Sequence, residues 1–137
     1  MYLLDTNIVS ELRKAKGGKA DKNVTAWAES VSATSLFLPV ITILELETGI
    51  LLIERRDPGQ GAILRVWLDG HVLPAFDGRI LAVDFAVAQR CAKLNVPDPR
   101  PHRDALIAAT ALVHGMTVVT RNVADFEPTG VEIFNPW

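Results

Sequence analysis

The stretch that decides the fold is residues 100–126, RPHRDALIAATALVHGMTVVTRNVADF. Pro101 stands where a helix begins and Gly115 just past its end, so the alanine-rich segment between them is predicted to be helical. The β-branched run MTVVT at 116–120 predicts a strand, and RNVADF at 121–126 predicts a turn or short helix. A helix leading directly into a buried strand is half of a βαβ unit and indicates a parallel sheet.

The same alternation of strands and helices extends over the rest of the chain. The runs that predict strands are YLL (2–4), LFLPV (36–40), RILAVD (79–84), MTVVT (116–120) and VEIF (131–134). The other helical patterns are NIVSELRK (7–14), NVTAWAESV (23–31), TILELETGILLIERR (42–56), GAILRVWLDGHVL (61–73) and FAVAQRCAKLN (85–95). We therefore expect an α/β fold, with a central, mostly parallel sheet of about five short strands and helices on both faces.

Local patterns also predict where some helices begin and which face they bury. Asn7 is the expected cap of the first helix, and Thr42 with Glu45 has the S/T-x-x-E form of a capping box. In the helical segment 42–56, Leu44, Leu51 and Leu52 form an apolar stripe at helical spacing.

The composition excludes several classes of protein. Hydrophobic residues make up 49% and charged residues 22% of the 137 positions, which disfavours disorder and indicates one domain. Cys91 is the single cysteine, so an internal disulfide is excluded. No apolar run approaches the roughly 18 residues of a membrane span, and no signal segment opens the chain, so we expect a cytoplasmic protein. The net charge of −2 means that nucleic-acid binding would need local basic patches.

Acidic and amide side chains recur where a predicted strand gives way to a helix. Asp5 follows the first strand, and Glu45 follows the second. Asp104 lies in the first turn of the alanine-rich helix, while Asn122 and Asp125 follow the strand after it. Because open parallel sheets bind ligands at the carboxyl ends of their strands, these side chains are expected at one edge. Each alone suits a helix cap, but their coincidence at one edge indicates a site.

Carboxylates gathered in one cleft require a cation, because unpaired charges raise one another's pKa. Mg²⁺ or Mn²⁺ prefers oxygen ligands, whereas a soft metal is disfavoured because Cys91 is alone and the histidines lack ligand spacing. A carboxylate-held cation of this kind orients a water and stabilises charge on a phosphate. The residues alone therefore predict metal-assisted phosphodiester hydrolysis.

Four segments carry a resemblance to a known family: LLDTNIVSEL, ITILELETG, RDALIAATAL and VVTRNVADF. In this order and at these spacings they resemble the four acidic motifs of PIN-domain ribonucleases. More narrowly, the chain resembles the VapC toxins of bacterial toxin–antitoxin pairs, including their FitB-like branch. The resemblance runs from Met1 to the closing IFNPW and implies a single PIN domain over residues 1–137.

The resemblance implies roles for the residues that match the motifs. Asp5, Glu45 and Asp104 would be catalytic acids and metal ligands, and Thr6 and Asn7 would support the first of them.

The fourth motif leaves two candidates for the last position of the site. Asn122 would contact the metal through water while Asp125 supplies charge as a catalytic acid, or Asp125 would only cap the helix. Both stay in the predicted site.

The resemblance also implies partners. VapC proteins are usually homodimers, and a cognate VapB-like antitoxin covers the active site and makes the contact with operator DNA. Their substrates are structured RNAs, often a tRNA anticodon region or an rRNA loop. Basic residues that would hold such an RNA backbone, or for the lysines equally form ordinary solvated surface, are Arg13, Lys14, Lys16, Arg103 and Arg121.

A second class of function stays open. The protein would then be a catalytically weak binding module, acting mainly as a subunit of a DNA-bound antitoxin repressor complex. Retention of Asp5, Glu45 and Asp104 together favours the enzyme. A phosphatase of the haloacid dehalogenase type is excluded because Asn7 stands where its second aspartate is needed. A nucleotide-binding fold is disfavoured because no glycine-rich phosphate loop occurs.

Overall fold

Five short parallel strands form the centre of the molecule, in the order β3-β2-β1-β4-β5. The computed structural model describes residues 1–137, and the strands are β1 (Tyr2–Leu4), β2 (Leu36–Pro39), β3 (Ile80–Leu81), β4 (Thr117–Val119) and β5 (Ile133–Phe134). The middle strand β1 pairs with both β2 and β4. All five predicted strands are present, although the third is shorter than the run RILAVD suggested.

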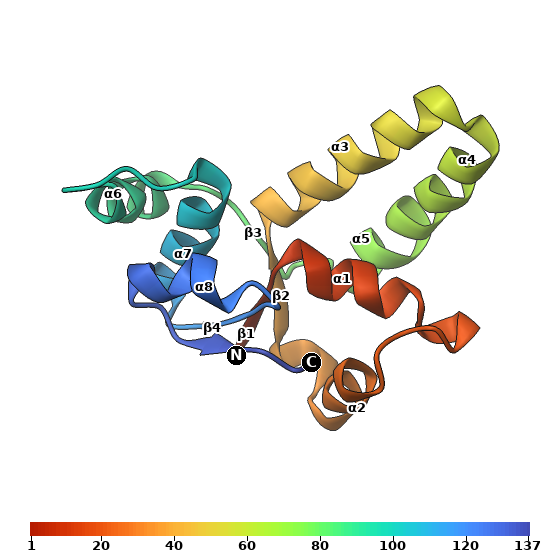
Figure 1. Ribbon diagram of the computed structural model, residues 1–137, viewed down its shortest axis with the longest axis horizontal. Coiled ribbons are helices and arrows are strands. Elements are labelled where there is room, and N and C mark those ends of the chain that lie inside the picture. Colours follow the sequence, from red (N-terminus) through yellow and green to blue (C-terminus); the bar gives the residue numbers. More distant parts are fainter.

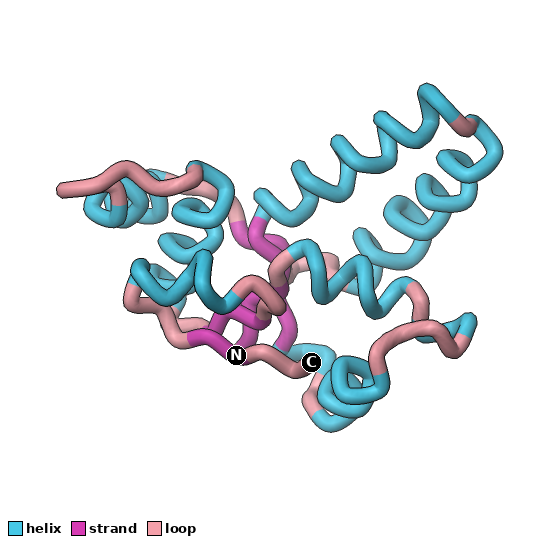
Figure 2. Tube along the Cα trace, viewed as in Figure 1, coloured by secondary structure: helices cyan, strands magenta, loops and turns pink.

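Helices cover both faces of the sheet, as expected (Figure 1). They are α1 (Thr6–Arg13), α2 (Lys22–Ser30), α3 (Val40–Arg56), α4 (Pro58–Trp67), α5 (Leu73–Ala75), α6 (Phe85–Leu94), α7 (His102–His114) and α8 (Val123–Phe126). Shorter helical turns are η1 (Ala15–Gly17), η2 (Ala33–Ser35), η3 (Leu68–Val72) and η4 (Glu127–Thr129). Helices α1, α3 and α4 lie on one side and α6, α7 and α8 on the other, and Figure 2 shows the short strands between them. No helix has the length and apolar character that crossing a membrane requires.

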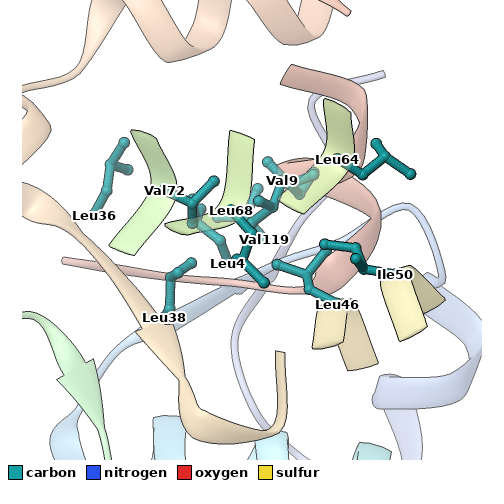
Figure 3. Packing of buried hydrophobic residues seen from close by; sticks show 11 residues of the cluster. Leu4, Val9, Leu36, Leu38, Leu46, Ile50, Leu64, Leu68, Val72 and Val119 are labelled. Carbon is teal, nitrogen blue, oxygen red and sulfur yellow. The ribbon is translucent and has the colours of Figure 1, made fainter. Parts of the chain in front are cut away.

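Neighbouring leucines of β1 anchor the two halves of the core. Leu3 and Leu4 are both fully buried, and successive strand residues point to opposite faces. Leu4 packs into the cluster formed with α1, α3 and α4, which includes Leu46 (Figure 3). Leu3 packs into the cluster formed with α7 and α8, which includes Ile107 and Phe126. The residue after Leu4 is therefore held firmly at the carboxyl edge of the sheet.

The alanines of α7 allow this helix to pack closely on two sides. Ala108 and Ala111 belong to the cluster under the sheet, whereas Ala105 and Ala109 pack against α6. All four are fully buried. Gly115 ends the helix in the left-handed conformation, with φ of 65°, as its position in the sequence predicted.

Helices α3 and α4 form an antiparallel hairpin that projects beyond the sheet (Figure 1). A Cβ atom at Gly61 would lie 2.7 Å from the Cα of Glu54, so only glycine fits this crossing. Arg65 of α4 donates to Glu47 at 2.7 Å and to Glu54 at 3.3 Å, and lies 3.5 Å from Asp69. The hairpin is thus closed by tight backbone packing and by opposite charges.

Two predicted helix caps are wrong. The first helix begins at Thr6, and its cap is Asp5 rather than Asn7, because the Asp5 carboxylate accepts the Thr6 N–H. Thr42 is not part of a capping box, because α3 already begins at Val40. The Thr42 hydroxyl instead donates to the Leu4 carbonyl at 3.0 Å and joins the helix to β1.

Two features of the hairpin differ from the sequence patterns. The buried face of α3 includes Leu46 and Ile50, whereas Leu44, Leu51 and Leu52 are exposed. This helix is apolar on more than one face, so the spacing of apolar residues did not identify the buried one. The helical segment expected to end before Pro74 continues through η3 into α5.

Candidate active site

The predicted acids meet at the carboxyl edge of the sheet. Asp5 follows β1, Glu45 lies near the start of α3, and Asp104 and Asp125 lie in the first turns of α7 and α8. Burial raises the pKa of Asp5, and the negative charges of Glu45 and Asp125 also raise it. Burial likewise raises the pKa of Asp104, and the charges of the other three acids raise it further. Elements far apart in the sequence thus bring four carboxylates close enough to repel one another.

Asp5 is the most buried of these acids, at 6% exposure. Its Oδ1 accepts the Thr6 N–H at 2.8 Å, and its Oδ2 accepts the Thr120 hydroxyl at 2.8 Å and the Asn7 amide at 3.3 Å. Burial raises the pKa of the Asp5 carboxyl, the bonds from Thr120 and Thr6 lower it, and the nearby acids raise it again. These bonds fix the carboxylate in one orientation while its charge remains costly.

Thr120 connects the ends of the two central strands, and the sequence did not identify it as a site residue. Its hydroxyl donates to Asp5 and accepts the backbone N–H of Asn122 at 2.9 Å and the amide of Asn7 at 3.3 Å. One donor and two acceptor positions are therefore all used. Leu4 pairs with Val119 across the sheet, so the next residues, Asp5 and Thr120, lie side by side. That register is a property of the fold, so the sequence alone contains no signal for Thr120.

Asn7 connects the start of α1 to the residues that follow β4. Its side-chain oxygen accepts the backbone N–H of Arg121 at 3.3 Å, while its amide donates to Asp5 and Thr120. Thr6 donates hydrogen bonds to Asp5 and Glu45, and Asn7 donates one to Asp5.

Glu45 is held at one oxygen and loosely contacted at the other. Its Oε1 accepts the Thr6 hydroxyl at 2.9 Å, which links α3 to α1. Its Oε2 lies 3.8 Å from the guanidinium of Arg103, on α7. This ion pair joins α3 to α7 across the site.

Asp104 has no compensating neighbour. Burial raises the pKa of its carboxyl, and the charges of Asp5, Asp125 and Glu45 raise it further, with no contact that lowers it. A nearby cation would stabilise the ionised form of such a carboxyl group.

The two candidates for the fourth position differ in their surroundings. Asn122 occupies the N-cap position of α8, but its side chain makes no capping hydrogen bond. Asp125 lies inside α8, so it is not a cap, and its charge acts on both Asp5 and Asp104. Both side chains are exposed.

The donor set fits a hard divalent cation. All the candidate ligand atoms are oxygens, and burial and the charges of the other three acids raise the pKa of Asp104. No three acidic, histidine or cysteine side chains stand at metal-ligand spacing in the structure. Mg²⁺ needs only one or two carboxylates, because it keeps several of its waters. The site therefore suits a cation that is shared between carboxylates, water and substrate.

The basic candidates lie in different settings. Arg13 stacks over Trp67 and Arg121 over Trp137, with guanidinium-to-ring distances of 5.9 and 5.3 Å. Arg103 is the one that contacts a site carboxylate. The remaining candidates are the exposed lysines, Lys14 and Lys16.

Comparison with known proteins agrees with this geometry. The PIN domain model matches residues 2–128. The VapC ribonuclease Y4jK of Sinorhizobium fredii is 37% identical over 145 residues, covering 100% of this chain and 98% of the relative. Toxin FitB of Neisseria gonorrhoeae is 35% identical over 143 residues, covering 100% and 99%. The solved structure of FitAB bound to an IR36 DNA fragment superimposes with a TM-score of 0.88 at 34% identity, covering 100% of this chain and 96% of the other. The chain belongs to the PIN domain family, in the group that contains the VapC and FitB proteins.

Proposed function

We propose that this protein is the toxin of a toxin–antitoxin pair and acts as a divalent-metal-dependent endoribonuclease. The proposal rests on one observation: four acids meet at one edge of the sheet, namely Asp5, Glu45, Asp104 and Asp125. All the charges that act on the pKa of Asp104 there are negative. The names of two full-length relatives, VapC ribonuclease and Toxin FitB, support the same activity.

The proposed cation is Mg²⁺ or Mn²⁺, held by Asp5, Asp104 and Glu45, with Asn122 contributing through a water. When bound, it supplies a water of lowered pKa and neutralises charge on the phosphate. Asp125 adds negative charge that strengthens the attraction for the cation. The oxygen-only donor set and the raised pKa of Asp5 and Asp104 support this assignment.

The chain's own residues would orient the reacting groups. The hydroxyls of Thr6 and Thr120 occupy one oxygen each of Glu45 and Asp5, which fixes both carboxylates. Oε2 of Glu45 has only the long contact with Arg103, so it is the oxygen available to the cation or to a water that the cation holds. Preorganised groups of this kind lower the barrier because they need no rearrangement during the reaction.

The proposed substrate is a structured RNA, such as a tRNA or rRNA loop, because unpaired loops expose the backbone to a compact site. Arg103 is the basic residue best placed to contact it, and Arg13, Lys14, Lys16 and Arg121 are candidates for more distant phosphates. The whole of residues 1–137 is proposed to act as one PIN domain in the cytoplasm.

The proposed protein partners are a cognate VapB-like antitoxin and a second copy of this chain, with operator DNA contacted only through the antitoxin. The solved complex of FitAB with DNA supports this arrangement. A cavity of about 200 Å³ between α1, α3 and α4 offers an attachment point beside the site, since it is lined by Glu45 and by apolar residues such as Ile53, Leu64 and Trp67.

The test is cleavage of an RNA hairpin by the purified protein, with and without EDTA. We expect cleavage that EDTA stops and that added Mg²⁺ or Mn²⁺ restores, and growth arrest when the protein is expressed alone in bacteria. Cleavage that continues in EDTA would refute the metal mechanism. Absence of both cleavage and growth arrest would instead favour a binding module that acts within a repressor complex.

A further inference from the structure

Arg103 is a positive charge placed at the mouth of an acidic site. Its guanidinium lies 3.8 Å from Oε2 of Glu45, and no other basic side chain of the chain forms an ion pair with any of the four site acids. It precedes Asp104 in the first turn of α7, so both side chains project from the same end of that helix, where no contact lowers the pKa of Asp104.

The contact between Arg103 and Glu45 is long and partly exposed to solvent. The separation of 3.8 Å is beyond hydrogen-bond distance, in contrast to the 2.7 Å bond from Arg65 to Glu47 in the hairpin. The Arg103 side chain is 56% exposed, and that of Glu45 is 27% exposed. A loose, solvated pair of this kind is weak, so a stronger cation or anion can replace either partner.

The other arginines near the site are committed elsewhere. Arg13 and Arg121 rest against the rings of Trp67 and Trp137, which holds their guanidinium groups in place. Arg103 has no such support. Its planar guanidinium is therefore free to turn from a carboxylate toward a phosphate, which it can bind through two parallel hydrogen bonds.

We propose that Arg103 exchanges partners at this site: it pairs with Glu45 and opposes cation binding in the free protein, and it binds an RNA phosphate once the cation has taken its place. The inference rests on the proposed function for its RNA step, but its first step concerns only the protein and the cation. Arg103 thereby couples metal binding to substrate binding, because the cation that engages Glu45 also releases the arginine.

The first experiment measures the cation alone. Wild type, Arg103→Gln and Arg103→Lys are titrated with Mn²⁺ without RNA, and the affinity is taken from the rise in melting temperature. Arg103→Gln should bind Mn²⁺ about two- to fivefold more tightly than wild type, the size expected for an exposed ion pair. Arg103→Lys keeps the charge and should stay close to wild type.

Arg56→Gln is the matched control. It removes the same charge from an exposed position at the far end of α3, eleven residues beyond Glu45 and about 16 Å along the helix. It should leave Mn²⁺ affinity unchanged. If Arg103→Gln binds Mn²⁺ no more tightly than wild type, the pair with Glu45 is an ordinary surface contact and the proposal is overturned.

The second experiment measures the RNA step, by the dependence of kcat/KM on KCl concentration for a hairpin RNA. Losing one phosphate contact should make the logarithmic slope shallower by about 1 in Arg103→Gln and leave it unchanged in Arg56→Gln. The loss in Arg103→Gln should fall more on KM than on kcat. Equal slopes in all proteins would overturn the phosphate role. If wild type cleaves no RNA, the proposed function fails with that role, and the Mn²⁺ titration still decides whether Arg103 opposes the cation.

Discussion

Acidic residues are gathered in two regions of this molecule, and the two treat their charges in opposite ways. In the α3–α4 hairpin, Arg65 lies among Glu47, Glu54 and Asp69, and the first two of these acids raise its pKa further above its usual value. At the carboxyl edge of the sheet, Asp104 faces only other acids, which raise its pKa. The cation of the hairpin contacts all three of its acids, whereas at the sheet edge Arg103 contacts Glu45 alone and Asp104 has no basic partner.

The difference indicates what each region is for. A charge network that includes its own cation holds two helices together and needs no ligand from outside. A cluster of unneutralised carboxylates costs stability and is retained where a ligand removes the cost. Substitutions of matched type in the two regions should therefore act on different properties, activity at the sheet edge and stability in the hairpin.

The largest expected effect is on catalysis by Asp5→Asn. The amide is a poor ligand for a hard cation, and loss of a direct ligand should exceed the 10- to 100-fold cost of losing an outer-shell partner. We therefore expect RNA cleavage to fall by more than about 100-fold while the circular dichroism spectrum stays native. The matched change in the hairpin, Asp69→Asn, should leave the cleavage rate unchanged. Equal losses in the two variants would mean that the comparison between the regions has no functional meaning.

The next effect concerns Thr120, which orients Asp5 without being an acid. Thr120→Val keeps the volume but removes the donor to Asp5 and the acceptor for the Asn122 N–H. We expect kcat to fall about 10- to 100-fold, in line with outer-shell partners of metal ligands, and the free energy of unfolding to fall by about 1–3 kcal/mol. Thr120→Ser should restore most of both quantities. If serine fails to rescue kcat, the methyl group rather than the hydroxyl is the part that matters.

The hairpin should respond through stability. In Gly61→Ala the new methyl would meet the backbone of Glu54 at 2.7 Å, so the helices must separate. We expect a loss of about 1–3 kcal/mol in chemical denaturation, with cleavage per folded molecule retained. Gly49→Ala, in the same hairpin, meets nothing within 4 Å and should be stabilising, because alanine is the better helix former. The opposite ranking would show that the crossing at Gly61 is not tight.

Within the sheet edge, the fourth position can be assigned by comparing Asp125→Ala with Asn122→Ala. Asp125 acts on the pKa of both Asp5 and Asp104, whereas Asn122 offers only a neutral carbonyl. We expect Asp125→Ala to lose several-fold more cleavage activity than Asn122→Ala, measured at saturating Mg²⁺ with both variants folded. A larger loss in Asn122→Ala would assign the fourth position to the amide.

The sequence predicted the sheet and the positions of the acids because those signals are local. Each strand is a short apolar run, and each acid follows such a run or opens a helix, as Asp5 and Asp104 do. The role of Thr120 depends on the register between β1 and β4, which lie more than a hundred residues apart and are joined only in the fold. The same holds for the ion pair between Arg103 and Glu45. Contacts that depend on tertiary packing leave no periodic pattern to find.

The helix α3 shows a second limit of sequence patterns. Leu46 and Ile50 are buried, yet Leu44, Leu51 and Leu52 are equally apolar and lie exposed. Hydrophobic spacing identifies a helix with one apolar face, but it does not choose between two. Packing in the core selects the face with Leu46 and Ile50 as the buried one. The other face, with its exposed leucines, is left available to a partner.

The smallest expected effect is also the sharpest test of the comparison, because it concerns sign. In EDTA, Asp104→Asn should melt higher than wild type, since it removes one of four mutually repelling charges. Burial and the neighbouring acids raise the folded-state pKa of Asp104 above its ordinary value of 3.8, so the folded protein holds this proton more tightly than the unfolded chain. Stability is therefore lost as pH rises from 3.8 through the raised pKa, and the cost is fully present above it. The advantage of the asparagine variant should grow as pH rises above 3.8 and level off above the raised pKa. The opposing effect is that Asp104 complements the dipole of α7, where its loss would cost about 0.3–1 kcal/mol.

Excess Mg²⁺ should reverse the order of the two melting temperatures. A ligand at a hundredfold excess over Kd stabilises the folded state by about 2.7 kcal/mol, and wild type alone should gain this in full. The contrary result is that Asp104→Asn melts lower in EDTA and that Mg²⁺ shifts both melting temperatures equally. Asp104 would then only stabilise α7, as Asp69 and Glu54 stabilise the hairpin, and the two regions would not differ at this position.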